Sequence, residues 1–384
     1  MTAKWPLVSL AELVRLERRP VELKPEQKYQ EIGIYCFGRG IFHKTPRTGL
    51  EIGDKNLYEL QDGDLILQVT FAWEGAIALC SKAEHGLYGS TRYPTFRVDE
   101  TRCFAPFLLR YLGTPGGLEQ INKICPGSAG RNRVLSLKRI HEVMVPLPPL
   151  PEQRRIVARI EELAAKINQA RGLREQQKLD VQQLLLSVFW KISKTAPRMP
   201  MDDVAPLVRR PVEVDLEGSY PEMGIRSFGN GTFHKPALSG SEVGSKRIFK
   251  IEPGDLVFSN VFAWEGAIAV ARSEDVGRFG SHRFMTCVPK KQKATSRFLC
   301  FYFLTDEGLE MIGAASPGGA GRNRTLGLEA LANIYVPIPS LEAQRWFDSL
   351  LASVAKLKEQ QAEATAELDA LLPSILDKAF RGEL

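Results

Sequence analysis

Two copies of the segment AGRNR carry the side chains best suited to bind a polyanion. The residues concerned are Arg131, Asn132, Arg133, Arg322, Asn323 and Arg324. Guanidinium groups neutralise phosphates, and Arg and Asn can form paired hydrogen bonds with the edges of guanine and adenine. We interpret these segments as candidate DNA contacts. The alternative is a surface turn whose arginines only keep the protein soluble.

Four further basic residues recur at matching positions and are candidate phosphate contacts. Lys44 and Lys235 each end the sequence FHK, whereas Arg92 and Arg283 end GSTR and GSHR. The histidines that precede the two lysines are the only ones matched between the copies. Two histidines are too few for a metal site or a catalytic triad, so we interpret them as hydrogen-bonded loop residues.

The sequence FAWEGAIA occupies residues 71–78 and returns at 262–269. Its large and small residues alternate, which predicts a strand with Trp73 on an apolar face. A core role for Trp73 and its counterpart Trp264 is one interpretation. The other places each indole against a base or sugar, with the following glutamate accepting a hydrogen bond from cytosine.

Motifs for catalysis are missing from the sequence. It contains no phosphate-binding G-x-x-x-x-G-K-[ST] loop and no N/D-P-P-Y/F tetrapeptide of the kind found in amino-methyltransferases. None of the six cysteines is matched by a cysteine in the other copy, which excludes a shared disulfide or zinc framework. We therefore expect reduced thiols, no metal, no cofactor and no catalytic residue.

The composition is that of a soluble globular protein with more than one domain. The chain has 384 residues, of which 44% are hydrophobic and 25% charged, and its net charge is +6. This charge is compatible with a polyanionic partner. No apolar stretch is long enough to cross a bilayer, and the N-terminus does not resemble a signal peptide, so a cytoplasmic location is expected.

One shift of 191 residues aligns the two halves without a gap. It pairs RRPVE at 18–22 with 209–213, and it pairs VPLPPLPEQRR at 145–155 with VPIPSLEAQRW at 336–346. A duplication with only two copies indicates two homologous units rather than a solenoid. Short strand-like runs before each proline-rich joint predict α+β domains, and helical periodicity after each joint predicts long helices.

The expected domains are a first α+β domain at 1–150, a long helix at 151–195, a second α+β domain at 196–340 and a second long helix at 341–384. Apolar residues at steps of four and three predict a coiled-coil seam on each helix. Arg174 and Gln177 interrupt the first seam, and Pro373 predicts a bend or break in the second helix. The connectivity makes paired helices antiparallel, which relates the two domains by a pseudo-twofold axis.

The predicted seam residues follow the same rhythm in both helices. They are Ile156, Ile160, Leu163, Ile167, Ala170, Val181, Leu184 and Val188 in the first helix, and Phe347, Leu350, Val354, Leu357, Gln361, Ala364, Leu368 and Leu371 in the second.

The two joints and the C-terminal ending LLPSILDKAFRGEL resemble the conserved regions of specificity subunits of Type I restriction-modification systems. This resemblance implies a non-catalytic subunit that selects a bipartite sequence in double-stranded DNA. It also implies partners: two methyltransferase subunits that use S-adenosylmethionine, and ATP-driven translocase/nuclease subunits, for adenine methylation or restriction. By the same resemblance, the joints contact partners through Gln153, Arg154, Gln344 and Arg345.

The similarity of the two copies extends to their loops, which predicts half-sites that are nearly reverse complements of each other. Differences such as Tyr35 against Arg226 and Arg39 against Asn230 predict where the half-sites differ. The main alternative is a stand-alone DNA-binding regulator with two reading heads. An enzyme active alone and a purely structural connector fit less well, because catalytic motifs are missing and two elaborate domains are present.

Overall fold

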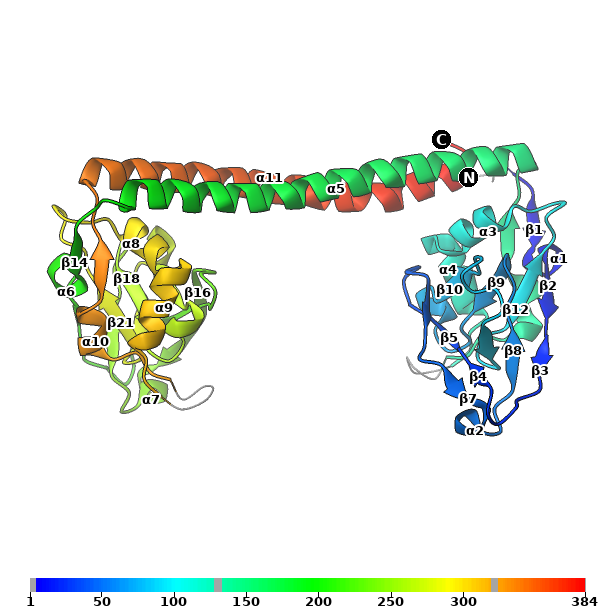
Figure 1. The fold of residues 1–384 in the computed structure, drawn as a ribbon, viewed down its shortest axis with the longest axis horizontal. Helices are drawn as coiled ribbons and strands as arrows, with labels where there is room; N and C mark the ends of the chain where they lie inside the picture. Colours follow the sequence, from blue (N-terminus) through cyan, green and yellow to red (C-terminus); the bar gives the residue numbers. More distant parts are fainter. Residues whose placement is uncertain (1–4, 128–132, 319–323, 384) are drawn as a thin grey trace. The chain divides into compact units, whose positions relative to one another are not determined.

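The computed structural model describes residues 5–127, 133–318 and 324–383, and the chain divides into two compact units (Figure 1). The first unit holds residues 1–173 and 363–384, and the second holds residues 174–362. Each unit combines a head of short strands and helices with one half of each long helix, α5 (Leu150–Ser193) and α11 (Leu341–Arg381). The predicted α+β class, with two similar domains joined by long helices, is confirmed.

The first head is built on a four-stranded antiparallel sheet of order β10-β9-β12-β2 and a three-stranded sheet of order β11-β8-β3. Its strands are β1 (Leu7–Ser9), β2 (Val14–Glu17), β3 (Pro20–Val21), β4 (Lys28–Tyr29), β5 (Ile32–Ile34), β6 (Ile41–His43), β7 (Arg47–Thr48), β8 (Leu57–Glu59), β9 (Asp64–Leu67), β10 (Ile77–Leu79), β11 (Tyr88–Ser90), β12 (Thr95–Val98) and β13 (Met144–Pro146). Its helices are α1 (Leu10–Leu13), α2 (Gly49–Ile52), α3 (Ala105–Leu112) and α4 (Pro115–Lys123), with 3₁₀ turns η1 (Ala72–Glu74) and η3 (Leu137–Glu142).

The second head repeats this plan, with sheets of order β19-β18-β21 and β16-β15-β20-β17. Its strands are β14 (Arg198–Pro200), β15 (Ser219–Ile225), β16 (Thr232–Ser239), β17 (Ile248–Lys250), β18 (Leu256–Ser259), β19 (Ile268–Val270), β20 (Phe279–Ser281), β21 (Phe284–Cys287) and β22 (Tyr335–Pro337). Its helices are α6 (Met201–Val204), α7 (Gly240–Val243), α8 (Ser296–Phe303), α9 (Asp306–Ala314) and α10 (Leu328–Ala332), with 3₁₀ turns η4 (Ala263–Glu265) and η5 (Ser273–Asp275).

A buried ion pair explains why RRPVE recurs in both halves, together with the dipeptide GD at 63–64 and 254–255. Arg19 lies 2.7 Å from Asp64 in the first head, and Arg210 lies 2.6 Å from Asp255 in the second. Both aspartates are buried, and an unpaired buried charge is costly, so each needs its arginine. These repeated residues stabilise the sheets and do not form the candidate site.

The long helices run antiparallel within each unit. At the start of α5, Ile156 and Ile160 share a buried cluster with Ala379 near the end of α11. In the second unit the ring of Phe189, near the end of α5, lies 5.6 Å from that of Phe347 at the start of α11. In both units the helix after the strands, α3 or α8, packs between the sheet and the long helices.

The predicted seam is buried at six positions and exposed at three. Ile156, Ile160, Ile167, Phe347, Val354 and Leu368 are buried, whereas Leu184, Leu357 and Leu371 are 53%, 55% and 45% exposed. An α-helix drifts relative to a strict heptad, so the apolar face turns away from the extrapolated positions. Leu185 and Phe189 are buried in place of Leu184, because the end of α5 packs on its head.

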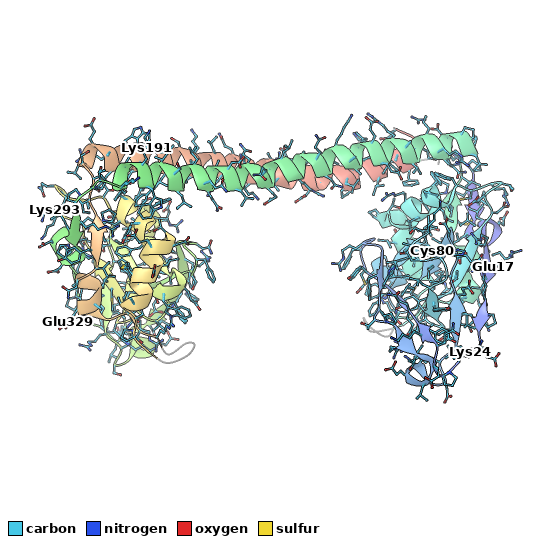
Figure 2. The ribbon with its side chains drawn as sticks, viewed as in Figure 1. Glu17, Lys24, Cys80, Lys191, Lys293 and Glu329 are labelled. Carbon is cyan, nitrogen blue, oxygen red and sulfur yellow. The ribbon has the colours of Figure 1, made fainter. Side chains whose placement is uncertain are left out.

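Three local features complete the fold. Helix α11 continues through Pro373, so the helix does not break there. Cys80 lies inside the first head (Figure 2), and burial raises the pKa of its thiol to about 12. No helix in the described part of the chain combines the length and apolarity needed to cross a bilayer.

Candidate nucleic-acid interface

The repeated FAWEGAIA segment forms a turn followed by a strand, so the continuous strand predicted for residues 71–78 is wrong. Ala72–Glu74 form η1, Gly75 follows with a φ of 79°, and β10 begins only at Ile77. This left-handed backbone favours glycine, which explains why Gly75 ends the turn. The second copy has the same conformation, with Gly266 at a φ of 74°.

Backbone carbonyls of this turn hold the loop of a neighbouring hairpin, residues 35–40 between β5 and β6. The N–H of Phe37 donates to the carbonyl of Glu74 at 2.8 Å, and that of Gly38 donates to Gly75 at 3.1 Å. The corresponding loop in the second head is 226–231, and its two hydrogen bonds measure 2.8 and 2.9 Å. The duplicated octapeptide therefore has a structural task, which is to seat one hairpin loop in each head.

The two tryptophans are half-buried and packed. Each indole N–H donates to the backbone carbonyl three residues earlier at 2.9 Å, and each ring contacts the core of its head. The guanidinium carbon of Arg133 lies 5.2 Å from the ring centroid of Trp73, and that of Arg324 lies 5.6 Å from that of Trp264. These are cation–π distances. The core interpretation is therefore supported, and DNA contact by the indoles stays a prediction.

Only the last arginine of each AGRNR segment is among the described residues. Outside them lie Arg131, Asn132, Arg322 and Asn323. Besides its contact with the indole, Arg133 donates from Nη1 to Oδ1 of Asn122 in α4 at 2.6 Å. Gly313 stands at the matching position of the second head, so this contact of Arg133 is not repeated there by the equivalent residue.

Backbone hydrogen bonds bring the loops of Arg92 and Arg283 beside the tryptophan turns. In the first head the N–H of Val69 donates to Arg92 at 3.0 Å, and the N–H of Leu135 donates to Val69 at 2.8 Å. The second head repeats both hydrogen bonds through Asn260, at 2.8 and 2.7 Å. The arginine loop, the residues before the turn and the segment after AGRNR therefore lie side by side in both heads.

Each head has a polar hollow beside this cluster, and matching residues line both. In the first head they are Glu31, Lys44, Lys55, Gln68, Ser90, Thr91, Arg92 and Tyr93, and in the second Glu222, Lys235, Lys246, Ser259, Ser281, His282, Arg283 and Phe284. The ammonium of Lys44 lies 3.7 Å from the buried Glu31 and 5.5 Å from the ring centroid of Tyr93. Lys235 likewise lies 3.7 Å from Glu222. We call these surfaces the basic hollows; they unite the predicted lysines and arginines.

The histidines beside these lysines are hydrogen-bonded, as predicted. Nε2 of His43 lies 2.8 Å from Glu84, and Nε2 of His234 lies 2.9 Å from Asp275. Burial alone would raise the pKa of Glu84, but hydrogen bonds from Ser81 and His43 lower this pKa below its ordinary value. The histidines therefore fix the loops behind the lysines.

Two residues that organise the hollow were not predicted from the sequence. Oε1 of Gln68 accepts hydrogen bonds from the N–H groups of Thr70 and Phe71, both at 2.7 Å, and so shapes the turn before Trp73. Glu31 contacts Lys44 and Arg47. Glu31 recurs as Glu222 in the second copy, so comparison of the copies could have identified it. Gln68 is replaced by Ser259 and could not have been found in this way.

The glutamines of the two joints are internal. Gln153 is fully buried, accepts a hydrogen bond from the N–H of Phe104 at 2.7 Å, and donates to two backbone carbonyls. Gln344 makes the equivalent three hydrogen bonds in the second unit. Direct partner contact through these two side chains therefore does not fit their positions. Arg154 and Arg345 are exposed at the same joints and stay predicted partner contacts.

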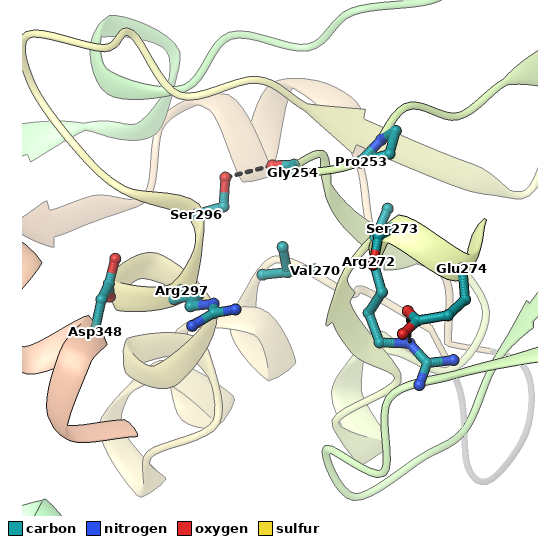
Figure 3. Close-up of a pocket in the computed structure, with 10 residues that line it drawn as sticks. Pro253, Gly254, Val270, Arg272, Ser273, Glu274, Ser296, Arg297 and Asp348 are labelled. Atoms are coloured by element: carbon teal, nitrogen blue, oxygen red, sulfur yellow. Dashed lines mark hydrogen bonds and ion pairs between the residues drawn. The ribbon is translucent and has the colours of Figure 1, made fainter. Parts of the chain in front are cut away.

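A separate hollow lies in the second unit at the start of α11 (Figure 3). The hydroxyl of Ser296 donates to the carbonyl of Gly254, and Asp348 projects from α11. Oδ1 of Asp348 has no hydrogen-bond partner among the described residues. Burial raises the pKa of this carboxyl, and a hydrogen bond from Thr295 and the charge of Arg297 partly oppose the rise. Val157 occupies the matching position of the first unit. The carboxyl group of this hollow is therefore particular to the second unit, and the hollow lies outside the repeated site.

Comparison with known sequences finds similarity to Type I specificity proteins. Residues 3–176 match the family model described as the Type I restriction modification DNA specificity domain. The specificity subunits of the Type I restriction enzymes EcoBI of Escherichia coli and StySPI of Salmonella potsdam are each 24% identical to this chain. These alignments cover 71% and 68% of this chain, but only 65% and 62% of the two relatives.

Solved structures show the same fold over the whole chain. The HsdS subunit from Thermoanaerobacter tengcongensis matches with a TM-score of 0.66 at 23% identity, covering 100% of this chain and 98% of that one. A chain from a structural study of complex assembly and conformational transition in the type I R-M system matches with a TM-score of 0.73 at 22% identity, covering 100% and 99%. The resemblance predicted from the joints and the C-terminal ending is confirmed.

Proposed function

We propose that this chain, a relative of the specificity subunits of Type I restriction-modification systems, recognises a double-stranded DNA sequence in two separated parts. One observation carries the proposal: both heads present the same cluster of an arginine on a tryptophan, an arginine loop and a basic hollow. Phosphates are bound by such cations and bases are read by nearby loops. Two equivalent clusters in one chain fit two half-sites.

We propose that the two half-sites are inverted with respect to each other, as expected for a duplicated head on paired antiparallel helices. Similar heads in opposite orientation read reverse-complementary sequences, as in dimeric DNA-binding proteins. The expected target is bipartite and nearly palindromic, with a spacer that is not read.

We expect partner subunits, rather than this chain, to carry out the chemical reactions on DNA. We propose that methyltransferase subunits and translocase/nuclease subunits bind this chain and carry out adenine methylation or restriction at the selected sequence. The exposed Arg154 and Arg345, which lie where each head meets its long helix, are the proposed partner contacts. Arg154 is pre-positioned, since its guanidinium carbon lies 4.6 Å from the ring centroid of Phe104.

Selection from a random duplex library tests this function. The full chain, purified alone and with the methyltransferase subunit of the same system, is expected to enrich two short sequences at a fixed separation. Methylation is expected only when the methyltransferase is present. Enrichment by the chain alone, with no methylation in either case, would favour a stand-alone DNA-binding regulator.

A further inference from the structure

Phe37 and Phe228 combine two unusual properties at matching positions of the repeat. Their side chains are 74% and 80% exposed. Their φ angles are 62° and 61°, and they are the only non-glycine residues with positive φ in the described part of the chain. A large aromatic residue is rarely found in this backbone region, which glycine adopts without strain.

The strained conformation is imposed by the turn beneath it. The N–H of Phe37 donates to Glu74, and the N–H of Tyr35 donates to Gly40 at 2.9 Å, which closes the hairpin loop. The second head forms the equivalent hydrogen bonds. Glycine would adopt this fixed backbone conformation with less strain. The exposed ring of phenylalanine makes little packing contact that could offset the strain. The fold itself therefore does not account for phenylalanine at either position.

The exposed rings belong to the proposed DNA-binding surface. The N–H of Phe37 donates to the carbonyl of Glu74, the residue after Trp73, and the guanidinium of Arg133 lies over the Trp73 ring. In the same hairpin loop Arg39 is exposed, with its guanidinium carbon 5.3 Å from the ring centroid of Tyr35. Each hairpin loop thus carries an exposed ring and an exposed arginine, which is Arg39 in the first head and Arg226 in the second. This combination suits a polyanion with an apolar interior better than it suits an apolar protein groove.

We infer that Phe37 and Phe228 each press against a base step of their own half-site and partly unstack it. Exposed phenylalanines act in this way in proteins that bend DNA, where the ring replaces base stacking and neighbouring cations hold the phosphates. The inference rests on the proposed function. It adds a specificity element, because flexible base steps such as TA and CA deform most easily.

Four variants of the full chain, in complex with its methyltransferase subunit, test the inference. Phe37→Gly and Phe228→Gly remove the ring and relieve the backbone, whereas Phe37→Ala and Phe228→Ala remove the ring and keep the strained conformation. Each variant is expected to lower affinity for the target duplex about tenfold, the size of one lost aromatic–base contact. The glycine variants are expected to melt at or above the wild-type temperature. Leu50→Ala and Leu216→Ala are matched controls, since these leucines are 77% and 72% exposed.

Fluorescence of 2-aminopurine placed at successive positions of each half-site locates the contact. Wild type is expected to raise the fluorescence at one step in each half, and each substitution is expected to abolish the rise in only one half. Unchanged affinity and fluorescence in all four variants would overturn the inference while the wild-type binding still supported the proposed function. Loss of methyltransferase binding with DNA affinity retained would also overturn it. Wild type that binds no specific duplex would instead refute the proposed function.

Discussion

The guanidinium of Arg133 lies between the indole of Trp73 and the amide oxygen of Asn122. A cation fixed in this way loses less side-chain freedom when it binds a phosphate. The repeat predicted the charge, because AGRNR occurs in both halves. It did not predict the partners of the arginine, because Asn122 is replaced by Gly313 in the second copy and Trp73 is distant in sequence.

Removal of this arginine is expected to weaken DNA binding and to make the affinity less dependent on salt concentration. Arg133→Ala and Arg324→Ala should each lower affinity about tenfold and reduce the slope of log K against log salt by about one. Titration of a labelled target duplex at several salt concentrations measures both quantities. Arg159→Ala on α5 removes the same charge from a residue that pairs with Glu162, and it serves as the control. Slopes equal to that of wild type would remove Arg133 and Arg324 from the site.

Asp348 is expected to destabilise the second unit at neutral pH. Burial raises its pKa, so the charged form is less favourable in the folded state than in the unfolded chain. The stabilising contribution of the bound proton is complete below the ordinary pKa of an aspartate and is lost as pH rises through the raised value. Asp348→Val, which copies Val157, should raise the free energy of unfolding by about 1 kcal/mol at pH 7. Urea unfolding at pH 7 and pH 5 checks this, and the gain should be smaller at pH 5.

The backbone conformation of Phe37 could not be predicted from the sequence. The letters F-G recur in both copies at the tip of the hairpin loop, but nothing in them reveals a positive φ at phenylalanine. The conformation comes from hydrogen bonds to Glu74 and Gly75, which lie in a different segment. Backbone strain of this kind depends on tertiary contacts and is visible only in the structure.

At the scale of elements, each joint connects a head to its long helix through one buried glutamine. Gln153 bonds the residues just before α3 and the joint itself, and Gln344 does the same before α8. These glutamines were predicted to contact partners because each joint resembles a conserved region of the family. Conservation of a joint does not distinguish a surface contact from an internal one, and only the hydrogen bonds do.

Gln153→Ala and Gln344→Ala are expected to destabilise their own units by about 2–4 kcal/mol, because each substitution leaves buried backbone groups without partners. Urea unfolding followed by circular dichroism measures the change. The control is Gln176→Ala, since Gln176 is exposed on α5 and bonds Asp180 at 2.8 Å. A change as small as that of the control would contradict the assigned role.

The long helices were predicted more closely than the strands. Periodicity located both helices, because a continuous helix depends on local pattern. It misplaced Leu184 and Leu357, where packing on the heads and helix drift decide the buried face. FAWEGAIA was predicted as a strand, although Gly75 carries a turn signal. In such short segments, backbone hydrogen bonds from distant residues override alternation.

At the scale of the whole molecule, the gapless repeat is evident in both the sequence and the structure. The shift of 191 residues pairs Arg19 with Arg210 in the sheets and Arg92 with Arg283 in the basic hollows. The central claim is therefore that two copies of one reading head select two related half-sites. Unmatched residues such as Tyr35 and Arg226, both in the hairpin loops, are where the half-sites should differ.

The most direct measurement is long-read sequencing of DNA from cells that carry this chain with its methyltransferase, followed by mapping of modified adenines. We expect one bipartite motif whose second half is nearly the reverse complement of the first, separated by a spacer of fixed length. Two unrelated half-sites, or a single uninterrupted motif, would contradict the claim that the duplicated heads read DNA as equivalent modules.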